Sequence, residues 1–349
     1  MIVPHYRPSF NRHEQAAARA VIKSQYIAQG SKVRKLEQLI SEYVNKKFGV
    51  AVSSGTTALI LALKALNIIE GDEIIIPSYT CIALWHAVKA VDGIPILADI
   101  ETDFYNLDPE DVKRKINPNT KAIIFPHMFG QPGRITEILE FGIPVIEDIA
   151  QAIGATVDEK PVGSFGHLSV VSFYATKVIG AGEGGAILTN DESIVSYIKD
   201  FREYDEKNDL KPRVNAKMSD LTAAVAIEQF KKLEQFTRKR YSILKLYKQI
   251  LEPYLNIPQN LKNSSLISNL YRCIVSHPHK SADELIDIGA KYGVTLRRPV
   301  FQPIHRYLGI TKFPNTDFAW ERQVSIPIFP DMKDDEIHFV ISFLKNIHS

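Results

Sequence analysis

One lysine stands where a chemically active amine is expected. Lys177 follows an apolar, strand-like run over residues 168–174 and precedes a glycine-rich loop that ends at Gly185. The strand desolvates the lysine on one side, and the glycines leave it approachable on the other. Partial burial favours the neutral, nucleophilic amine, which is what Schiff-base chemistry with carbonyl compounds requires. The alternative is an ordinary lysine at a strand end.

The same loop contains a misleading match to a nucleotide-binding motif. Gly180, Gly182 and Gly185 match the pattern G-x-G-x-x-G of dinucleotide sites. That motif needs a helix directly after the glycines, so that the helix N-terminus meets the pyrophosphate. Here residues 186–189 form an apolar run that predicts a strand. We therefore exclude the dinucleotide interpretation.

Two other segments could act together with this lysine. Residues 52–58 (VSSGTTA) predict a strand, a tight turn at Gly55 and a helix N-terminus whose free amides could bind phosphate. Taken alone, this segment fits a plain capped helix better. Residues 143–151 predict an apolar strand that ends at Asp148, where an N-cap for a following helix is the alternative to a functional role.

Together the three segments point to one cofactor. A buried aspartate needs a cationic partner, and a pyridinium nitrogen would supply one. A phosphate site, a strand-end aspartate and a glycine-flanked lysine are the parts that pyridoxal phosphate requires. They occur in that order along the chain, and their joint occurrence by chance is far rarer than any one of them.

The elements that must position these residues alternate between β-rich and helical runs over residues 45–200. Such alternation predicts an α/β domain in which a mainly parallel central sheet lies between helices. The expected strands are residues 49–52, 73–77, 94–98, 122–126, 145–147, 168–174 and 186–189.

A second, smaller α/β domain is expected at the C-terminus. A long helical region that starts at a cap, Ser219 or Asp220, and breaks near Pro253 would connect the two domains. We predict a large domain over residues 1–235 and a small domain over residues 236–349, with residues 1–30 packed on the small domain. Within the small domain we expect a strand at residues 271–275 and helices at 281–292 and 334–345.

Composition and charge exclude several classes of function. The chain has 349 residues, 45% of them hydrophobic, and a net charge of only +2, so neither nucleic acid nor a membrane is indicated as a partner. No apolar run approaches the roughly 18 residues of a membrane helix, and residues 1–7 do not resemble a signal peptide. The two cysteines show neither a disulfide framework nor metal-ligand spacing, so we expect no metal site and a reducing, cytoplasmic location.

The chain resembles the DegT/DnrJ/StrS family of pyridoxal-phosphate aminotransferases, fold-type-I enzymes that act mostly on nucleotide-linked keto-sugars. The similar segments span nearly the whole chain. They are residues 26–30 (YIAQG), 53–59 (SSGTTAL), 71–80 (GDEIIIPSYT), 120–127 (TKAIIFPH), 146–151 (IEDIAQ), 172–185, 215–219 (NAKMS) and 324–329 (VSIPIF).

The resemblance implies catalytic roles for three residues. Lys177 would bind the cofactor covalently, Asp148 would pair with the pyridine nitrogen and Gln151 would contact the phenolic oxygen. An ionised Asp148 would keep the ring nitrogen protonated, which makes the ring an electron sink. Once displaced by the amino donor, usually L-glutamate in this family, Lys177 would act as general base and acid.

The resemblance also implies how the phosphate is bound. Gly55, Thr56 and Ser172 would hold it within one subunit. Asn215 would reach the phosphate of the neighbouring subunit, which implies a homodimer with shared active sites.

One position departs from the family pattern. Cys81 stands where many members have an aromatic residue that stacks on the cofactor ring, and a thiol covers less of the ring face. Tyr79 or Trp85 could compensate for the missing aromatic.

The acceptor pocket is expected to draw on four residues, His127, Lys217, Arg298 and His305. The first three would suit phosphate or diphosphate oxygens. The alternatives are a structural role for His127 and a solvated pair of Arg298 with Arg297.

The function predicted from these features is transfer of an amino group from L-glutamate to a nucleotide-linked keto-sugar, for amino-sugar, polysaccharide or secondary-metabolite biosynthesis. Three alternatives stay open. One is an aminotransferase for a small phosphorylated ketone. Another is a sugar dehydratase, against which Lys177 argues because that branch has histidine in its place. The last is a non-enzymatic, cofactor-binding regulator, for which no DNA-binding element is evident.

Overall fold

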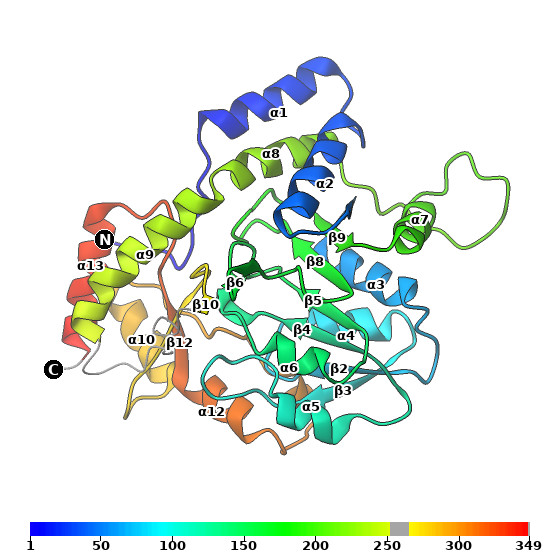
Figure 1. Ribbon diagram of the computed structural model, residues 1–349. Helices are drawn as coiled ribbons and strands as arrows, with labels where there is room; N and C mark the ends of the chain where they lie inside the picture. Colours follow the sequence, from blue (N-terminus) through cyan, green and yellow to red (C-terminus); the bar gives the residue numbers. More distant parts are fainter. Residues whose placement is uncertain (252–264, 348–349) are drawn as a thin grey trace.

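A seven-stranded sheet forms the centre of the computed structural model, which describes residues 1–251 and 265–347 (Figure 1). The strand order is β1-β9-β8-β5-β4-β2-β3, and β9 alone runs antiparallel to the others. The predicted mainly parallel sheet is confirmed, with strand ends within two residues of those expected. The strands are β1 (Phe48–Val52), β2 (Glu73–Pro77), β3 (Ile94–Ala98), β4 (Thr120–Pro126), β5 (Val145–Asp148), β8 (Leu168–Ser172) and β9 (Gly185–Thr189).

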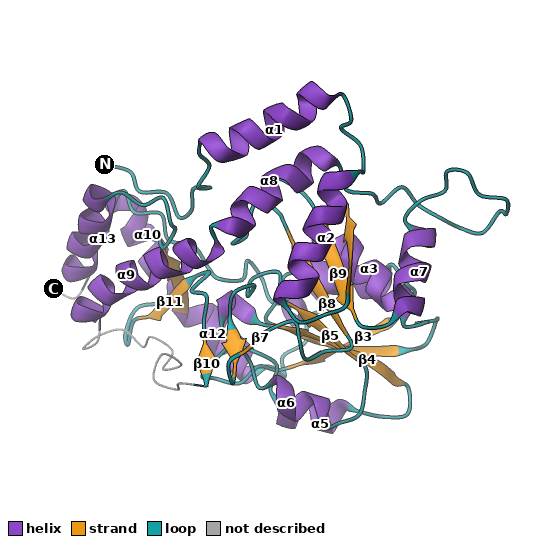
Figure 2. Ribbon diagram, turned by 45° about the horizontal axis from the view of Figure 1, so that its top comes forward, coloured by secondary structure: helices purple, strands orange, loops and turns teal. Residues whose placement is uncertain are grey.

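Helices cover both faces of this sheet (Figure 2). Consecutive residues of one strand enter different cores: Ile123 belongs to the core that contains Val33 of α2, whereas Ile124 belongs to the core that contains Leu61 of α3. This alternation is the period of two that a strand buried on both faces requires. The helices of this part of the chain are α1 (Arg12–Ser24), α2 (Ser31–Tyr43), α3 (Gly55–Ala65), α4 (Ala83–Lys89), α5 (Pro109–Lys115), α6 (Ile135–Leu139), α7 (Glu192–Phe201) and α8 (Asp220–Lys231).

The C-terminal residues build a core of their own, which includes Ile243 and Tyr247 of α9. Its strands β11 and β12 pair antiparallel, and the predicted strand and two helices of this region are present. The expected helix break near Pro253 lies outside the described residues, and the domain boundary at residue 235 stays a prediction. The elements are α9 (Leu233–Leu251), β11 (Cys273–Ser276), α10 (Ala282–Tyr292), α11 (Ile304–Tyr307), α12 (Pro314–Arg322), β12 (Gln323–Ile326) and α13 (Asp334–Asn346). A small sheet, β10-β6-β7, consists of β6 (Thr156–Val157), β7 (Lys160–Pro161) and β10 (Leu266–Ile267).

The N-terminal segment divides between the two cores. Val3 is fully buried in the small-domain core, and Arg7 pairs with Glu336 at 2.8 Å. Helix α1, in contrast, lies along α8 (Figure 1), where Gln229 donates a hydrogen bond to Glu14 at 2.7 Å. The prediction that all of residues 1–30 pack on the small domain is therefore wrong for α1, because the buried Glu14 finds its polar partner on the large domain.

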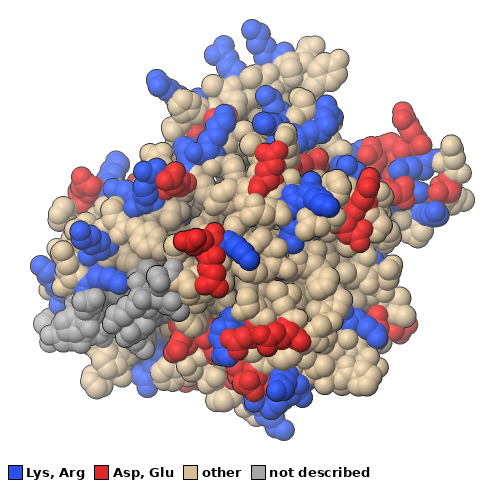
Figure 3. Space-filling model, viewed as in Figure 1, with Lys and Arg blue, Asp and Glu red and all other residues tan. Residues whose placement is uncertain are grey.

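The surface carries both signs of charge. On the face shown in Figure 3, basic and acidic side chains are interspersed and form no continuous field of one sign. No helix within residues 1–251 and 265–347 has the length and apolar character needed to cross a bilayer.

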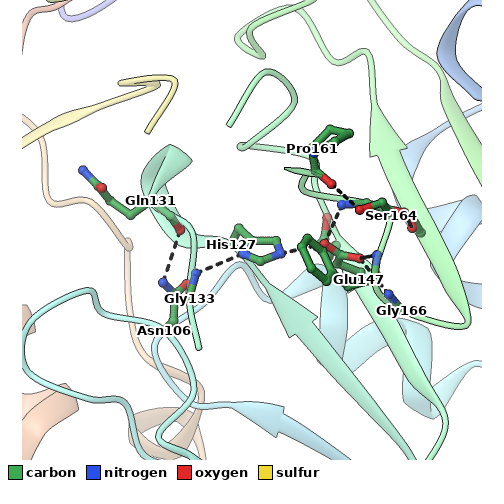
Figure 4. A network of polar contacts seen from close by, with 12 residues as sticks. Asn106, His127, Gln131, Gly133, Glu147, Pro161, Ser164 and Gly166 are labelled. Atoms are coloured by element: carbon green, nitrogen blue, oxygen red, sulfur yellow. Dashed lines mark hydrogen bonds and ion pairs between the residues drawn. The ribbon is translucent and has the colours of Figure 1, made fainter. Parts of the chain in front are cut away.

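The buried carboxylate of Glu147, near the end of β5, forms hydrogen bonds with neighbouring loops and with His127 (Figure 4). Glu147 accepts hydrogen bonds from His127 Nε2 at 3.0 Å and from the backbone amides of Gly163, Phe165 and Gly166. Burial alone would raise the pKa of Glu147, but His127 and the amides of Gly166 and Gly163 outweigh burial and lower this pKa. The carboxylate is therefore held ionised inside the protein.

The substitution Glu147→Gln should lower the free energy of unfolding by about 3 kcal/mol, because an amide NH2 would face backbone donors. Since the pKa of Glu147 is lowered on folding, its contribution is present above the ordinary value of 4.5 and is lost as pH falls below it. Urea unfolding at neutral pH and below pH 4.5 measures both effects. Glu70→Gln, at an exposed position, is the matched control. Equal unfolding curves for the two variants would contradict this account.

Candidate active site

The carboxyl ends of the parallel strands meet at one edge of the sheet and carry the predicted site residues. The strand register places Asp148, at the end of β5, beside Pro126, at the end of β4. Gly185 pairs with both Ser172, at the end of β8, and Val52, at the end of β1. The aspartate, the phosphate segment and the lysine loop therefore lie side by side, although they are far apart in the sequence.

The N-terminus of α3 forms a narrow cradle against β8 and β9. Ser54 Oγ accepts a hydrogen bond from the Thr57 amide at 3.0 Å, which leaves the amides of Gly55 and Thr56 at the open first turn. A Cβ added at Gly55 would lie 2.8 Å from the Cβ of Ser172. The close approach of these backbones creates the small, amide-lined space that a phosphate group requires.

The lysine lies in a tight loop between β8 and β9. The amides of Phe173 and Ala175 donate to the carbonyls of Gly184 and Gly182, each at 2.9 Å. Both glycines have positive φ, 136° and 93°, which other residues rarely adopt. Residue 185 begins β9 rather than a helix, so the exclusion of the dinucleotide motif is confirmed. Lys177 is half-buried in this loop, with Nζ 5.6 Å from the centre of the Tyr271 ring.

Asp148 is a nearly buried carboxylate, 8% exposed, and its ionised form would be stabilised by a cationic partner. Burial raises the pKa of Asp148, against the opposing effects of the Ala150 amide, which donates to Oδ1 at 2.9 Å, and of the Lys177 ammonium. A turn, not a helix, follows Asp148, so the N-cap alternative is wrong. A cationic ring nitrogen beside this carboxylate would offset the cost of its burial.

Gln151 is oriented by the loops around it. Its Oε1 accepts a hydrogen bond from the Phe129 amide at 2.9 Å. Because that amide can only donate, the NH2 group of Gln151 is left to donate to a ligand. Asn269 Nδ2 donates to the carbonyls of Gln151 and Ile153 at 3.0 and 2.8 Å and so fixes the loop after β5. A phenolic oxygen is a suitable acceptor for the free NH2 group.

These features fit pyridoxal phosphate. The cradle at Gly55 and Ser172 matches a phosphate, Asp148 matches a pyridinium nitrogen, and Gln151, three residues after Asp148, offers a hydrogen-bond donor. Lys177 supplies the amine that attaches the cofactor.

Two other residues expected near the cofactor are exposed. Asn215 lies on the segment between α7 and α8, directly before Ala216, whose carbonyl accepts a hydrogen bond from the Ser53 amide at 2.8 Å, and its role toward a neighbouring subunit stays a prediction. Cys81 is exposed. Tyr79 does not take the place of the missing aromatic, since it is fully buried with its ring 5.9 Å from that of Phe129. Trp85 packs against the core on the α3 face of the sheet.

Both histidines predicted for the acceptor pocket are structural. His127 is fully buried, accepts from the Gly133 amide at Nδ1 and therefore donates to Glu147 from Nε2. His305 is 1% exposed, and its nitrogens lie 2.7 Å from Ser78 Oγ and 3.1 Å from Asp317 Oδ1. Neither ring has a nitrogen left for a ligand, which corrects the expectation for these two residues.

The two cations predicted for the same pocket have partners from the protein. Lys217 Nζ lies 3.1 Å from Glu203 and 2.8 Å from Asp205. Arg298 pairs with Asp283 at 2.7 Å, and its guanidinium carbon lies 3.9 Å from the centre of the Trp320 ring. A role for Lys217 or Arg298 toward the acceptor stays a prediction, and it requires these ion pairs to open.

Residues from the N-terminus and the small domain also approach Lys177, and the sequence reasoning missed them. Tyr6 Oη donates to the carbonyls of Ala175 and Lys177 at 3.2 and 3.4 Å. Tyr271 packs beside the lysine amine. The only sequence signal was that Tyr271 begins a predicted strand, and nothing in the spacing connects it to Lys177.

Comparison with known proteins agrees with this geometry. The model of the DegT/DnrJ/EryC1/StrS aminotransferase family matches residues 8–345. The chain belongs to this family. It is therefore a pyridoxal-phosphate-dependent aminotransferase, as the resemblance predicted, and the fold-type-I architecture is confirmed.

Individual members of the DegT/DnrJ/EryC1/StrS family match along almost the whole chain. Uncharacterized protein MJ1066 of Methanocaldococcus jannaschii is 32% identical over 99% of this chain and 98% of its own length. GDP-perosamine synthase of Escherichia coli O157:H7 is 29% identical over 99% of both chains. The structure of DesV from S. venezuelae superposes with a TM-score of 0.89 at 27% identity, covering 96% of this chain and 94% of DesV.

The substitution Gly55→Ala should raise the dissociation constant for pyridoxal phosphate at least about tenfold, because the new methyl group would crowd Ser172 and narrow the cradle. Titration of the apoprotein with the cofactor, followed by absorbance, measures the change. Thermal unfolding of the apoprotein measures separately how far the contact with Ser172 lowers stability, and the titration is made well below the unfolding temperature of the variant. Unchanged cofactor affinity would contradict a phosphate site at this position.

Proposed function

We propose that this enzyme transfers the amino group of L-glutamate to a nucleotide-linked keto-sugar in the cytoplasm and works as a homodimer. The observation that carries the proposal is the placement of Lys177 at the same sheet edge as Asp148, a nearly buried carboxylate whose pKa is raised by burial. The two cysteines are free thiols, which is consistent with a reducing compartment.

The family relationship supports a keto-sugar as the acceptor. Proteins named GDP-perosamine synthase, from Escherichia coli O157:H7 and Vibrio cholerae, match this chain from end to end at 29% identity. We therefore favour a nucleotide-linked keto-sugar over a small phosphorylated ketone. A lysine at position 177 argues against the dehydratase alternative, because an amine is needed to exchange with the amino donor.

Asp148, Lys177 and Gln151 each have a separate role in the proposed reaction. Bound pyridoxal phosphate supplies a carbonyl that exchanges amines and a ring that withdraws electrons. A protonated ring nitrogen beside Asp148 would reverse the effect of burial on that carboxyl group and keep it ionised. Lys177 moves the proton at the α-carbon of the donor, from a loop that two glycine carbonyls hold in place. Gln151 presents its NH2 group to the phenolic oxygen.

Lys177→Ala should abolish amino transfer and the visible absorption band of the lysine-bound cofactor. Asp148→Asn should lower the rate of the glutamate half-reaction at least about a hundredfold, because the ring nitrogen loses its anionic partner. Spectra before and after addition of L-glutamate measure both. Lys160→Ala, at an exposed position, should behave as wild type. A Lys177→Ala enzyme as active as this control would contradict the assignment.

Shared active sites in a homodimer make a separate prediction. Lys177→Ala and Asn215→Ala should each be inactive alone, but a refolded equal mixture should regain about a quarter of wild-type activity. Half of the dimers in such a mixture are hybrids, and each hybrid has one site with both residues intact. A mixture as inactive as its parents, with dimers present by light scattering, would contradict a shared site.

A further inference from the structure

A small cavity lies next to Lys177, between the N-terminal segment and the small domain. Its volume is about 50 Å³. Polar side chains from four segments of the chain line it, together with Ile326 and Ile328. They are His5, Tyr6, Thr176, Tyr271, Arg272 and Ser325. None of the acceptor residues predicted from the sequence lies there.

Two arginines, Arg272 and Arg240, lie at this cavity, and neither forms a salt bridge with a carboxylate of the described residues. Arg272 lines it, and Arg240 lies behind it, close enough to Tyr6 and Tyr271 for their charges to interact. Arg240 is 1% exposed, and its Nε and Nη1 atoms have no hydrogen-bond partner. Within residues 1–251 and 265–347, neither arginine forms an ion pair. Buried cations are normally paired, so the arrangement calls for an anion.

His5 does not supply that anion and does not add charge. Burial, then Arg272 and Arg297, lower the pKa of His5 to about 3, so the ring is neutral at physiological pH. Its Nε2 lies 2.8 Å from Ser325 Oγ and 3.1 Å from Arg272 Nη1. His5 therefore holds the guanidinium in position and leaves its charge uncompensated.

The cavity is close enough to the catalytic lysine to act on the same ligand. The guanidinium carbon of Arg272 and Nζ of Lys177 lie 5.1 and 5.6 Å from the centre of the same ring, that of Tyr271. Thr176, which lines the cavity, directly precedes Lys177. A ligand whose nitrogen reaches the lysine can therefore place an anionic group a few bonds away in the cavity.

We propose that this cavity is the carboxylate-binding subsite for the amino donor, with Arg272 donating hydrogen bonds to the carboxylate and Arg240 contributing charge from behind. The inference rests on the proposed function, since it concerns the donor of that reaction. The small volume of the cavity, about 50 Å³, suits a carboxylate group better than a sugar ring. Guanidinium groups bind carboxylates through charge-assisted hydrogen bonds.

The test compares Arg272→Gln with Arg272→Lys in the half-reaction with L-glutamate and in binding of glutarate, an unreactive dicarboxylate. Arg272→Gln should raise the KM for glutamate and the dissociation constant for glutarate by about 10- to 100-fold, and Arg272→Lys should recover part of the loss. The KM for the keto-sugar and the cofactor spectrum should not change. Arg238→Gln, on the exposed side of α9, is the control for loss of one arginine.

L-alanine distinguishes the two carboxylates of glutamate. If the α-carboxylate occupies the cavity, Arg272→Gln should impair alanine and glutamate alike. If the side-chain carboxylate does, the variant should lose the preference for glutamate over alanine. Unchanged KM and glutarate affinity in Arg272→Gln would overturn the subsite while leaving the proposed function intact. Failure of the wild type to react with glutamate would instead overturn the donor, and glutarate binding would still test the cavity.

Discussion

Two consecutive carboxylates at the end of β5 point to opposite sides of the sheet, and the site depends on this division. Glu147 turns into the protein, where His127 and three backbone amides donate hydrogen bonds to its carboxylate. Asp148 turns to the sheet edge, where the Ala150 amide donates a hydrogen bond to it at 2.9 Å and the charge of Lys177 acts on it. A slip of one residue in the register of β5 would exchange the two side chains. The bonds to Glu147 prevent that slip and thereby aim Asp148 at the cofactor.

The same contrast separates structural charges from functional ones elsewhere in the molecule. Both ring nitrogens of His305 are occupied by protein groups, Ser78 and Asp317. Arg240 and Arg272 form no ion pair in the described part of the chain, and burial raises the pKa of Asp148 despite the nearby Lys177. Burying an unpaired charge costs free energy. A protein therefore keeps such a charge mainly where a ligand of opposite charge binds beside it.

The sequence was most informative where function depends on local geometry. The glycine loop around Lys177, the turn at Gly55 and the strand that ends at Asp148 are each contained in about ten residues, so their residue types predicted both the strands and the cofactor. The parallel sheet then brought these segments to one edge, as its topology requires.

Prediction failed where a side chain is satisfied by a partner far along the chain. His305 bonds to Ser78, His127 to Glu147 and Glu14 of α1 to Gln229, and no spacing in the sequence reveals these pairs. For the same reason Tyr271 and Arg272 were not recognised as neighbours of Lys177. A histidine or arginine read from sequence alone looks equally suited to a ligand and to a structural bond.

The central claim is that one lysine at the sheet edge carries the cofactor. The most direct measurement is reduction of the purified protein with borohydride in the presence of pyridoxal phosphate, followed by peptide mass spectrometry. The account predicts a single phosphopyridoxyl modification, on Lys177, that forms at stoichiometric cofactor concentration. Modification of other lysines in place of Lys177, or no modification at that concentration, would contradict it.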